Sequence, residues 1–361
     1  MMQVTAPLSA ALEQDGPIRP SERWAAIWEA GVPIARGEWV RVPGPQAEMT
    51  LCLEFTVPPV RVSGPVRLWQ GQAAPGRALA LYRLPEGAFR LVHGEIDLTT
   101  GPDLGRTGET LSLRYRSCAR GRGDILDIIN HDRTQRHRVR TGLAVAARLD
   151  ELLPRDERFL QVCQVAAIAG FGLPPSDLPG MSGQAVVMTR GGARAVDSLR
   201  VGNELVTATG ARMPLRWIER RPRLCLGRSA PVRLRAPYFG LARDIWVTPE
   251  TRVVRSGPAV EYIFGVEKVL VRAGDMTTIA GARRDRWKPV RHVHHLMLDD
   301  HACVMVDRCG IETALLADVI AAGDAKVASQ LAETDRTPCL PVLDRAGAQA
   351  LIGFKGRRVL G

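Results

Sequence analysis

Apolar and polar residues alternate with a period of two along much of the first half of the chain. In residues 110–116, TLSLRYR, the apolar side chains of Leu111, Leu113 and Tyr115 alternate with polar ones, as they do in a strand with one buried face. Turns rich in Gly, Pro and Asp separate this segment from five others with strand-like composition, TLCLEFTV, VRLWQ, ALALYRL, AFRLVHGEIDL and DILDII. Six strands at this spacing predict an antiparallel β-sandwich or a small jelly roll.

A short amphipathic helix is expected near the start of the chain. Residues 21–32 place Trp24, Ile27 and Trp28 at helical spacing. Gly31 follows, where a helix commonly ends.

The middle of the chain predicts a helical connector and a domain boundary. Residues 143–172 have the composition of two helical pieces, which Pro154 separates. The Pro- and Gly-rich stretch 173–180, LPPSDLPG, marks the boundary. The expected parts of the first half are an N-terminal helix and extension (1–45), a β-sandwich-like domain of unknown role (46–135) and a helical connector (136–178).

Strand-like segments return after residue 180. Gly and Pro turns separate segments that are all expected to be strands, among them QAVVMT, MPLRWIERR, PVRLRA, EYIFG, EKVLV, VHHLML and ACVMVD. The stretch 246–254, WVTPETRVV, predicts a strand, a polar turn containing Pro249 and a second strand. A closing helix is expected from about Asp344.

The order of the segments from Gly180 onward resembles the Hint fold of hedgehog C-terminal domains and inteins. The segments that carry the resemblance to bacterial Hint-domain proteins include VVMTRGGARAVDSLRVGNELVTATG, LRWIERR, PVRLRAPYFG, DIWVTPETRVV, HVHHLMLDDHACVMVDRCGIETALL and TPCLPVLDRAGAQALI. The resemblance implies a β-horseshoe domain over residues 179–353, followed by a tail (354–361). The fold class expected for the whole chain is therefore mainly β, with the β-sandwich-like domain before the Hint-type domain.

The resemblance also implies a reaction. In active Hint domains, a Cys or Ser at the first residue attacks the preceding carbonyl in an N-to-S or N-to-O acyl shift. A histidine in a Thr-x-x-His segment helps the amide nitrogen to leave.

This sequence departs from the family pattern at both positions. The nucleophile's place falls on Gly180 or, with a loop one residue shorter, on Met181, and neither side chain can attack a carbonyl. The Thr-x-x-His segment keeps its threonine as Thr248, but Thr251 stands in place of the histidine. We therefore expect that autoprocessing is lost, while Ser182 stays open as a replacement nucleophile.

Histidines in the late segment are the remaining candidates for chemistry. His294 and His295 point to opposite faces if they lie on a strand, so one is expected to be buried and the other exposed. These histidines, with His301, are interpreted as polar residues that support the fold. The alternative is a metal site of His294, Asp300 and His301, which lacks a completing ligand cluster.

No residue is assigned a catalytic role with certainty, and no cofactor or metal is expected. The residues that an active domain would use are Ser182, Thr248, His294 and His301.

A net charge of +11 and a pI of about 9.9 raise the possibility of nucleic acid or another acidic partner. Arginine supplies almost all of the basicity and is scattered between acidic residues, as on a solvated surface. Two basic runs could contact phosphate, residues 131–140 and residues 283–288 with the aromatic Trp287. The runs are interpreted as a polar linker face and a solvated turn.

The cysteines and the N-terminus bear on the compartment. Seven cysteines form no CxxC pair, which argues against a zinc site and a disulfide framework and favours a reduced cytoplasm. The N-terminus lacks the pattern of a Sec signal, and no stretch of 18 apolar residues predicts a membrane span. Export that does not use an N-terminal Sec signal stays open.

The sequence thus predicts a non-catalytic scaffold or interaction protein with an unidentified protein partner. One alternative is an active protein that cleaves itself near residue 180. The other is an arginine-rich nucleic-acid-binding protein.

Overall fold

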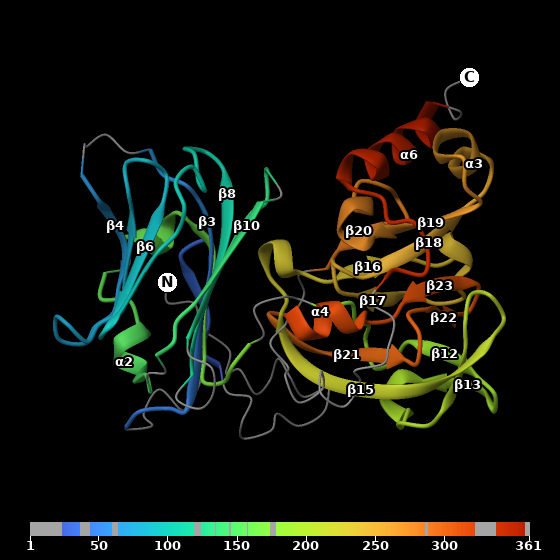
Figure 1. Cartoon of the computed structure of the whole chain (residues 1–361), viewed down its shortest axis with the longest axis horizontal. Coiled ribbons are helices and arrows are strands. Elements are labelled where there is room, and N and C mark those ends of the chain that lie inside the picture. Colours follow the sequence, from blue (N-terminus) through green and yellow to red (C-terminus); the bar gives the residue numbers. More distant parts are fainter. Residues whose placement is uncertain are drawn as a thin grey trace, which may run out of the picture. The chain divides into compact units, whose positions relative to one another are not determined.

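The chain divides into two compact units, Met1–Pro175 and Ser176–Gly361, shown in the computed structural model of Figure 1. The structure describes residues 24–36, 44–59, 64–118, 124–133, 135–143, 146–156, 158–173, 178–285, 288–321 and 337–357. No helix among these residues is both long and apolar enough to cross a membrane.

Two antiparallel sheets build the first unit. The larger sheet has the strand order β10-β9-β8-β3-β11-β1-β2 and the smaller one β4-β5-β6-β7. The strands of the larger sheet are β1 (Trp24–Glu29), β2 (Val32–Arg36), β3 (Glu48–Thr56), β8 (Thr110–Cys118), β9 (Ile125–Asn130), β10 (Gln135–Arg140) and β11 (Cys163–Ala169). Those of the smaller sheet are β4 (Val66–Gln70), β5 (Ala80–Arg83), β6 (Phe89–His93) and β7 (Ile96–Thr99).

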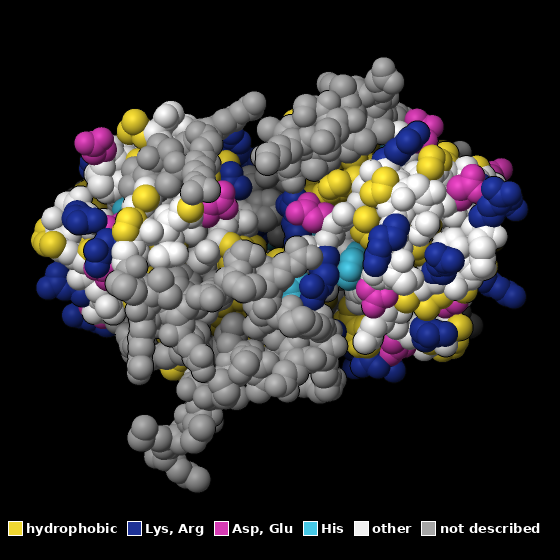
Figure 2. Space-filling view, turned by 90° about the horizontal axis from the view of Figure 1, so that it is seen from below, with side chains coloured by type: hydrophobic (Ala, Val, Ile, Leu, Met, Phe, Trp, Pro, Cys, Tyr) yellow, Lys and Arg dark blue, Asp and Glu magenta, His cyan; other side chains and the backbone are white. Residues whose placement is uncertain are grey.

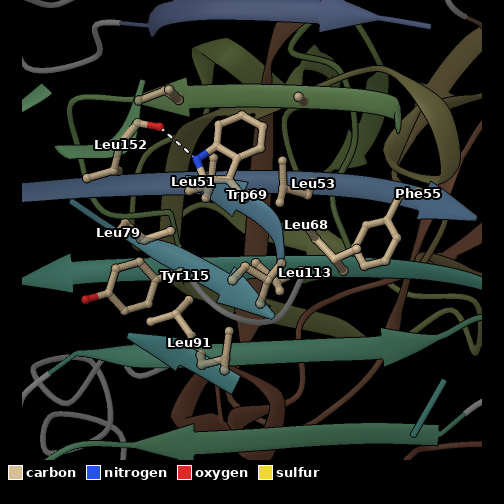
Figure 3. Packing of buried hydrophobic residues seen from close by; sticks show 14 of the residues in the cluster. Leu51, Leu53, Phe55, Leu68, Trp69, Leu79, Leu91, Leu113, Tyr115 and Leu152 are labelled. Carbon is tan, nitrogen blue, oxygen red and sulfur yellow. Dashed lines mark hydrogen bonds between the residues drawn. The ribbon is translucent and has the colours of Figure 1, made fainter. Parts of the chain in front are cut away.

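Apolar side chains from both sheets share one core (Figure 3). Leu51 and Leu113 come from the larger sheet and Leu91 from the smaller one, and all three are buried. The indole Nε1 of Trp69 on β4 donates to the carbonyl of Leu152 at 3.0 Å, so a buried polar group is paired. The predicted strands between residues 49 and 130 are present, except that the segment predicted as one strand at residues 88–98 forms two, β6 and β7. The β-sandwich-like fold is confirmed.

The helix predicted for residues 21–32 is wrong, because the described part, from Trp24 onward, forms the hairpin β1–β2. Ala30 and Gly31 form its turn, with φ values of 48° and 77°, which suit a two-residue hairpin loop. Trp24 to Trp28 are all buried. Burial on both faces removes the alternation that marks a strand, and helical spacing then arises by chance.

The prediction of a helical connector at residues 136–178 is also wrong. Residues 163–169 form β11, an inner strand of the larger sheet that pairs with β3 and β1. Only two short helical turns precede it, the helix α2 (Leu149–Leu152) and the 3₁₀ turn η3 (Phe159–Gln161). A continuous apolar run such as Val165–Ala169 fits a buried helix and a buried strand equally well.

The second unit contains a nine-stranded and a three-stranded sheet. The orders are β19-β18-β23-β22-β12-β14-β15-β21, with β13 beside β12, and β17-β16-β20. The strands are β12 (Val186–Thr189), β13 (Gly192–Ala195), β14 (Glu204–Val206), β15 (Arg212–Leu224), β16 (Val232–Leu234), β17 (Ile245–Val247), β18 (Arg252–Ser256), β19 (Lys268–Arg272), β20 (Ala282–Arg284), β21 (Val290–Leu298), β22 (Cys303–Val306) and β23 (Cys309–Glu312). Short 3₁₀ turns are η4 (Val196–Ser198), η5 (Gly227–Ser229), η6 (Tyr238–Gly240) and η7 (Ala273–Met276).

Three helices complete the described part of this unit, α3 (Pro258–Phe264), α4 (Leu316–Ala321) and α6 (Arg345–Arg357). The helix expected from about Asp344 is confirmed as α6, which packs on α3 through the stacked rings of Tyr262 and Phe354. The strand expected at EYIFG is wrong, because these residues lie in α3 and its C-cap. Pro258 at the first helical position and left-handed Gly265 at the end define this helix despite its strand-like composition.

Candidate functional site

The chain enters the second unit along β17 and β21. Met181 and His294 exchange two backbone hydrogen bonds, at 3.0 and 2.8 Å. On the other side, the Ser182 amide donates to the carbonyl of Trp246 and the Thr248 amide to the carbonyl of Gly180, both at 2.8 Å. The backbone from Gly180 to Ser182 is therefore fixed between two strands.

Two buried threonine hydroxyls hold the peptide at Gly180. Thr251 Oγ1 accepts the Gly180 amide at 2.9 Å, and it lies 2.9 Å from both Gly180 O and Thr248 Oγ1, either of which can accept its proton. Thr248 Oγ1 donates to the carbonyl of Leu178 at 3.0 Å. The turn of WVTPETRVV, closed by the Thr251 amide on Thr248 O, thus presents both hydroxyls to one stretch of backbone.

A histidine faces the carbonyl just before Gly180. His295 Nδ1 lies 2.7 Å from the Pro179 carbonyl oxygen, and because a carbonyl only accepts, Nδ1 carries the proton. The ring is buried and stacks on Trp217 at a centroid distance of 6.5 Å. This contact polarises the carbonyl that a nucleophile at residue 180 would attack.

The imidazole also fills the space that a side chain at residue 180 needs. A Cβ built on Gly180 would lie 2.8 Å from His295 Nδ1 and 2.9 Å from Cε1. The backbone of Gly180 is outside the left-handed region, so the obstacle is steric and not conformational. Thr248, Thr251 and His295 thus hold the backbone around Gly180. Residue 180 itself has no side chain that could act as a nucleophile.

Ser182 follows Met181, the residue that bridges to His294, but no hydrogen bond joins the Ser182 and His294 side chains. Ser182 Oγ and His294 Nδ1 are both buried, and neither has a hydrogen-bond partner within the described ranges. Burial, and then the charge of Arg220, lower the pKa of His294 to about 4. His294 and His295 are both buried, so the expectation of one exposed histidine is wrong.

The sequence around this peptide matches a known domain family. Residues 179–318 match the family model of the Hint domain, and the match begins at the peptide that the threonines and His295 hold. The chain carries a Hint domain. A comparison with curated proteins gave no match. Among solved structures, the lectin UEA-II complexed with galactose is similar at 8% identity over 42% of this chain and 75% of the lectin chain. The TM-score of this similarity is 0.23.

The sequence had grouped His301 with the residues of this site, but its contacts lie elsewhere in the Hint domain. His301 Nε2 lies 3.1 Å from Glu312 Oε1, and Nδ1 accepts the Cys339 amide at 2.9 Å. Asp300 is exposed. In the parts of the chain that the structure describes, no group of three or more His, Cys, Asp or Glu side chains is placed to hold a metal ion, so the alternative of a site at His294, Asp300 and His301 finds no support.

Sequence reasoning missed the contact between His295 and Pro179. One of His294 and His295 was expected to be buried, but its partner could not be named, since His295 and Pro179 lie 116 positions apart. The sequence signal for this contact was the adjacent pair His294–His295. Adjacent residues of a strand point to opposite faces, and His295 is the one that faces the backbone before Gly180.

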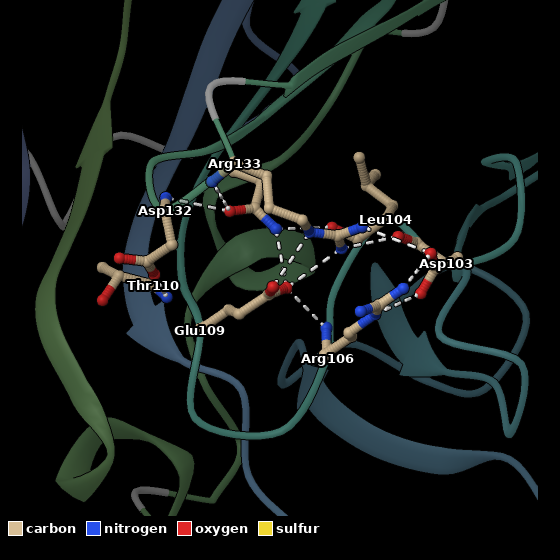
Figure 4. Close-up of polar contacts among 8 residues, drawn as sticks. Asp103, Leu104, Arg106, Glu109, Thr110, Asp132 and Arg133 are labelled. Carbon is tan, nitrogen blue, oxygen red and sulfur yellow. Dashed lines mark hydrogen bonds and ion pairs between the residues drawn. The ribbon is translucent and has the colours of Figure 1, made fainter. Parts of the chain in front are cut away.

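The basic run at residues 131–140 is partly neutralised by local ion pairs where it is described. Arg133 bonds to Glu109 and to the Asp103 carbonyl, and Asp103 also pairs with Arg106 (Figure 4). On β10, two arginines pair with Asp127, namely Arg136 and Arg138. The linker interpretation is wrong, because β10 is the edge strand of the larger sheet. Trp287 of the second run lies outside the described residues.

Proposed function

We propose that the Hint domain does not cleave its own chain and serves as a scaffold or interaction module. The observation that carries this proposal is Gly180. It stands where the family resemblance places the nucleophile, and its amide and neighbouring carbonyls are engaged by Thr251, Thr248 and His295.

The chemistry of an acyl shift supports the same conclusion. The reaction requires a nucleophile for the covalent step and an acid for the departing amide nitrogen. Thr251 Oγ1 bonds to that nitrogen as an acceptor, and a hydroxyl does not titrate near neutral pH. The loss of general acid–base help alone slows such a step by about 10²–10⁴-fold.

Incubation of the purified full-length chain tests this proposal. We expect one band at 39.4 kDa after prolonged incubation with or without dithiothreitol or hydroxylamine, which cleave thioesters and esters. Two fragments whose new termini lie at residues 179–182, identified by mass spectrometry, would overturn it.

Self-cleavage through Ser182 is the second candidate function. It is favoured by two buried atoms without hydrogen-bond partners in the described residues, one on Ser182 and one on His294. Ser182 Oγ and His294 Nδ1 are both buried, and His294 forms a bridge with Met181, the residue before Ser182. The lowered pKa of His294 keeps this base neutral at pH 7. If this candidate is correct, the wild type yields fragments split at the Met181–Ser182 bond, and Ser182→Ala and His294→Gln do not. The control is Ser198→Ala, which replaces an exposed serine of the same unit and should cleave as the wild type does.

The third function, nucleic-acid binding, has only net charge in its favour. Basic, acidic and apolar side chains are interspersed over the described surface in Figure 2. Several arginines of the second unit pair with acids, including Arg216 with Asp299, Arg233 with Asp244 and Arg252 with Glu312. Charge that is paired locally releases few counterions on binding.

A further inference from the structure

Two cysteines that are far apart in the sequence meet in the second unit. Cys303 begins β22 and Cys339 lies in the segment before α6, 36 residues later. Their Sγ atoms are 3.9 Å apart. Cys303 is buried, whereas Cys339 is the exposed one among the seven cysteines, all of which lie in described residues.

The surroundings prepare Cys339 to react as a thiolate. The Cys303 thiol is within hydrogen-bonding distance of Cys339 Sγ, and this bond is the first cause that lowers the pKa of Cys339, against the effect of burial. The pKa of Cys303 is raised by the same bond and by burial. One sulfur is therefore an accessible nucleophile, and the other keeps its proton beside it.

His301 fixes the position of this pair. Its Nδ1 accepts the backbone amide of Cys339, and its Nε2 faces Glu312, which also pairs with Arg252 of β18. An acceptor role for Nδ1 places the imidazole proton on Nε2. The backbone of Cys339 is thus hydrogen-bonded to the side chain of His301, in the loop before β22. This bond holds Cys339 beside Cys303.

We propose that Cys303 and Cys339 form a peroxide-reactive thiol pair, in which Cys339 is oxidised first and Cys303 resolves it to a disulfide. The Cys339 thiolate attacks one oxygen of hydrogen peroxide, which breaks the O–O bond and leaves Cys339 as a sulfenic acid while hydroxide departs. Cys303 Sγ then attacks Cys339 Sγ, and the sulfenic hydroxyl leaves as water with the Cys303 proton. The two thiols lose two electrons, and hydrogen peroxide is reduced to two waters.

The disulfide would fasten the C-terminal segment to the sheet. An S–S bond is about 2.05 Å long, so side-chain rotation must close the present gap. The segment already touches β19, since the Leu270 amide donates to Pro341 O at 2.8 Å and the Leu343 amide to Leu270 O at 2.9 Å. Oxidation adds a covalent link between this segment and β22.

Labelling of the wild-type full chain is the first test, and it needs no variant. The fully reduced protein is expected to show one fast-reacting thiol with a chromogenic disulfide reagent, and none after treatment with one equivalent of hydrogen peroxide. Peptide mapping without reductant is expected to show Cys303 and Cys339 in one cross-linked peptide. Cys339 is expected to react at least about tenfold faster than the buried Cys225.

Variants then separate the two steps. Cys303→Ala is expected to stop at the sulfenic acid, which dimedone traps on Cys339, and Cys339→Ser is expected to leave Cys303 reduced. Cys225→Ser is the matched control, because Cys225 is a buried thiol of the same unit that bonds to Arg223 O, and it should cross-link as the wild type does.

Three outcomes would overturn the proposal. One is a fast thiol other than Cys339, and the second is conversion of wild-type Cys339 to sulfinic acid without a cross-link. The third is a disulfide that joins two chains and not Cys303 to Cys339.

Discussion

Gly180 is the residue at which the Hint site excludes any side chain. A Cβ there would lie 2.8 Å from His295 Nδ1 and 3.1 Å from His294 O. Gly180→Ala is therefore expected to reduce the free energy of unfolding by about 1–3 kcal/mol, measured by urea denaturation. Gly191→Ala is the matched control, since its Cβ would meet only Thr189 Oγ1, at 3.8 Å. Equal losses in the two variants would contradict the steric argument.

His294 makes stability depend on pH. Its pKa in the folded state is about 4, below the ordinary histidine value of 6.5, chiefly because of burial. The unfolded chain therefore binds this proton first, and the stability present above about pH 6.5 is lost as the pH falls towards 4. The loss is expected to reach roughly 2–3 kcal/mol.

His294→Gln is expected to flatten this dependence. The measurement is the difference between the free energies of unfolding at pH 7 and pH 4.5, compared between wild type and variant so that other titrating groups cancel. An unchanged difference would show that His294 is protonated equally in both states.

At the scale of elements, strands with alternating or strand-like composition could be predicted from the sequence, including the doubly buried β3 and β9, and the alanine-rich strands β1 and β11 could not. The alternation in residues 110–116 gave β8 directly. In β1 and β11, almost every side chain is buried, so period and composition both allowed a helix. Only the neighbouring strands of the sheet decide between the two structures.

The turn of the β1–β2 hairpin tests this assignment. Gly31 has a φ of 77°, and a Cβ there would lie 3.1 Å from Leu160 O. Gly94 also has a positive φ, 58°, but its Cβ would meet nothing within 4 Å. Gly31→Ala is therefore expected to lower the melting temperature more than Gly94→Ala, because both variants carry backbone strain and only the first adds a clash. A helix at this position would reverse the order.

At the scale of the whole molecule, contacts between residues distant in the sequence could not be predicted from the sequence. The resemblance located the Thr248–Thr251 turn and Gly180, but the hydrogen bond of His295 to Pro179 depends on how β21 lies against the first residues of the domain. The Cys303–Cys339 pair was missed for the same reason, since 36 residues separate two cysteines without a motif. Long-range pairing is fixed by topology, which local patterns do not encode.

The hydrogen bonds at Met181 and Ser182 have a mechanical consequence. Tension applied through the preceding chain reaches the Hint domain at a backbone bonded to His294 on one side and to Trp246 on the other. These bonds and the threonine contacts at Gly180 must yield before the pull reaches the core. The backbone from Gly180 to Ser182 is therefore expected to resist extraction from the domain under force.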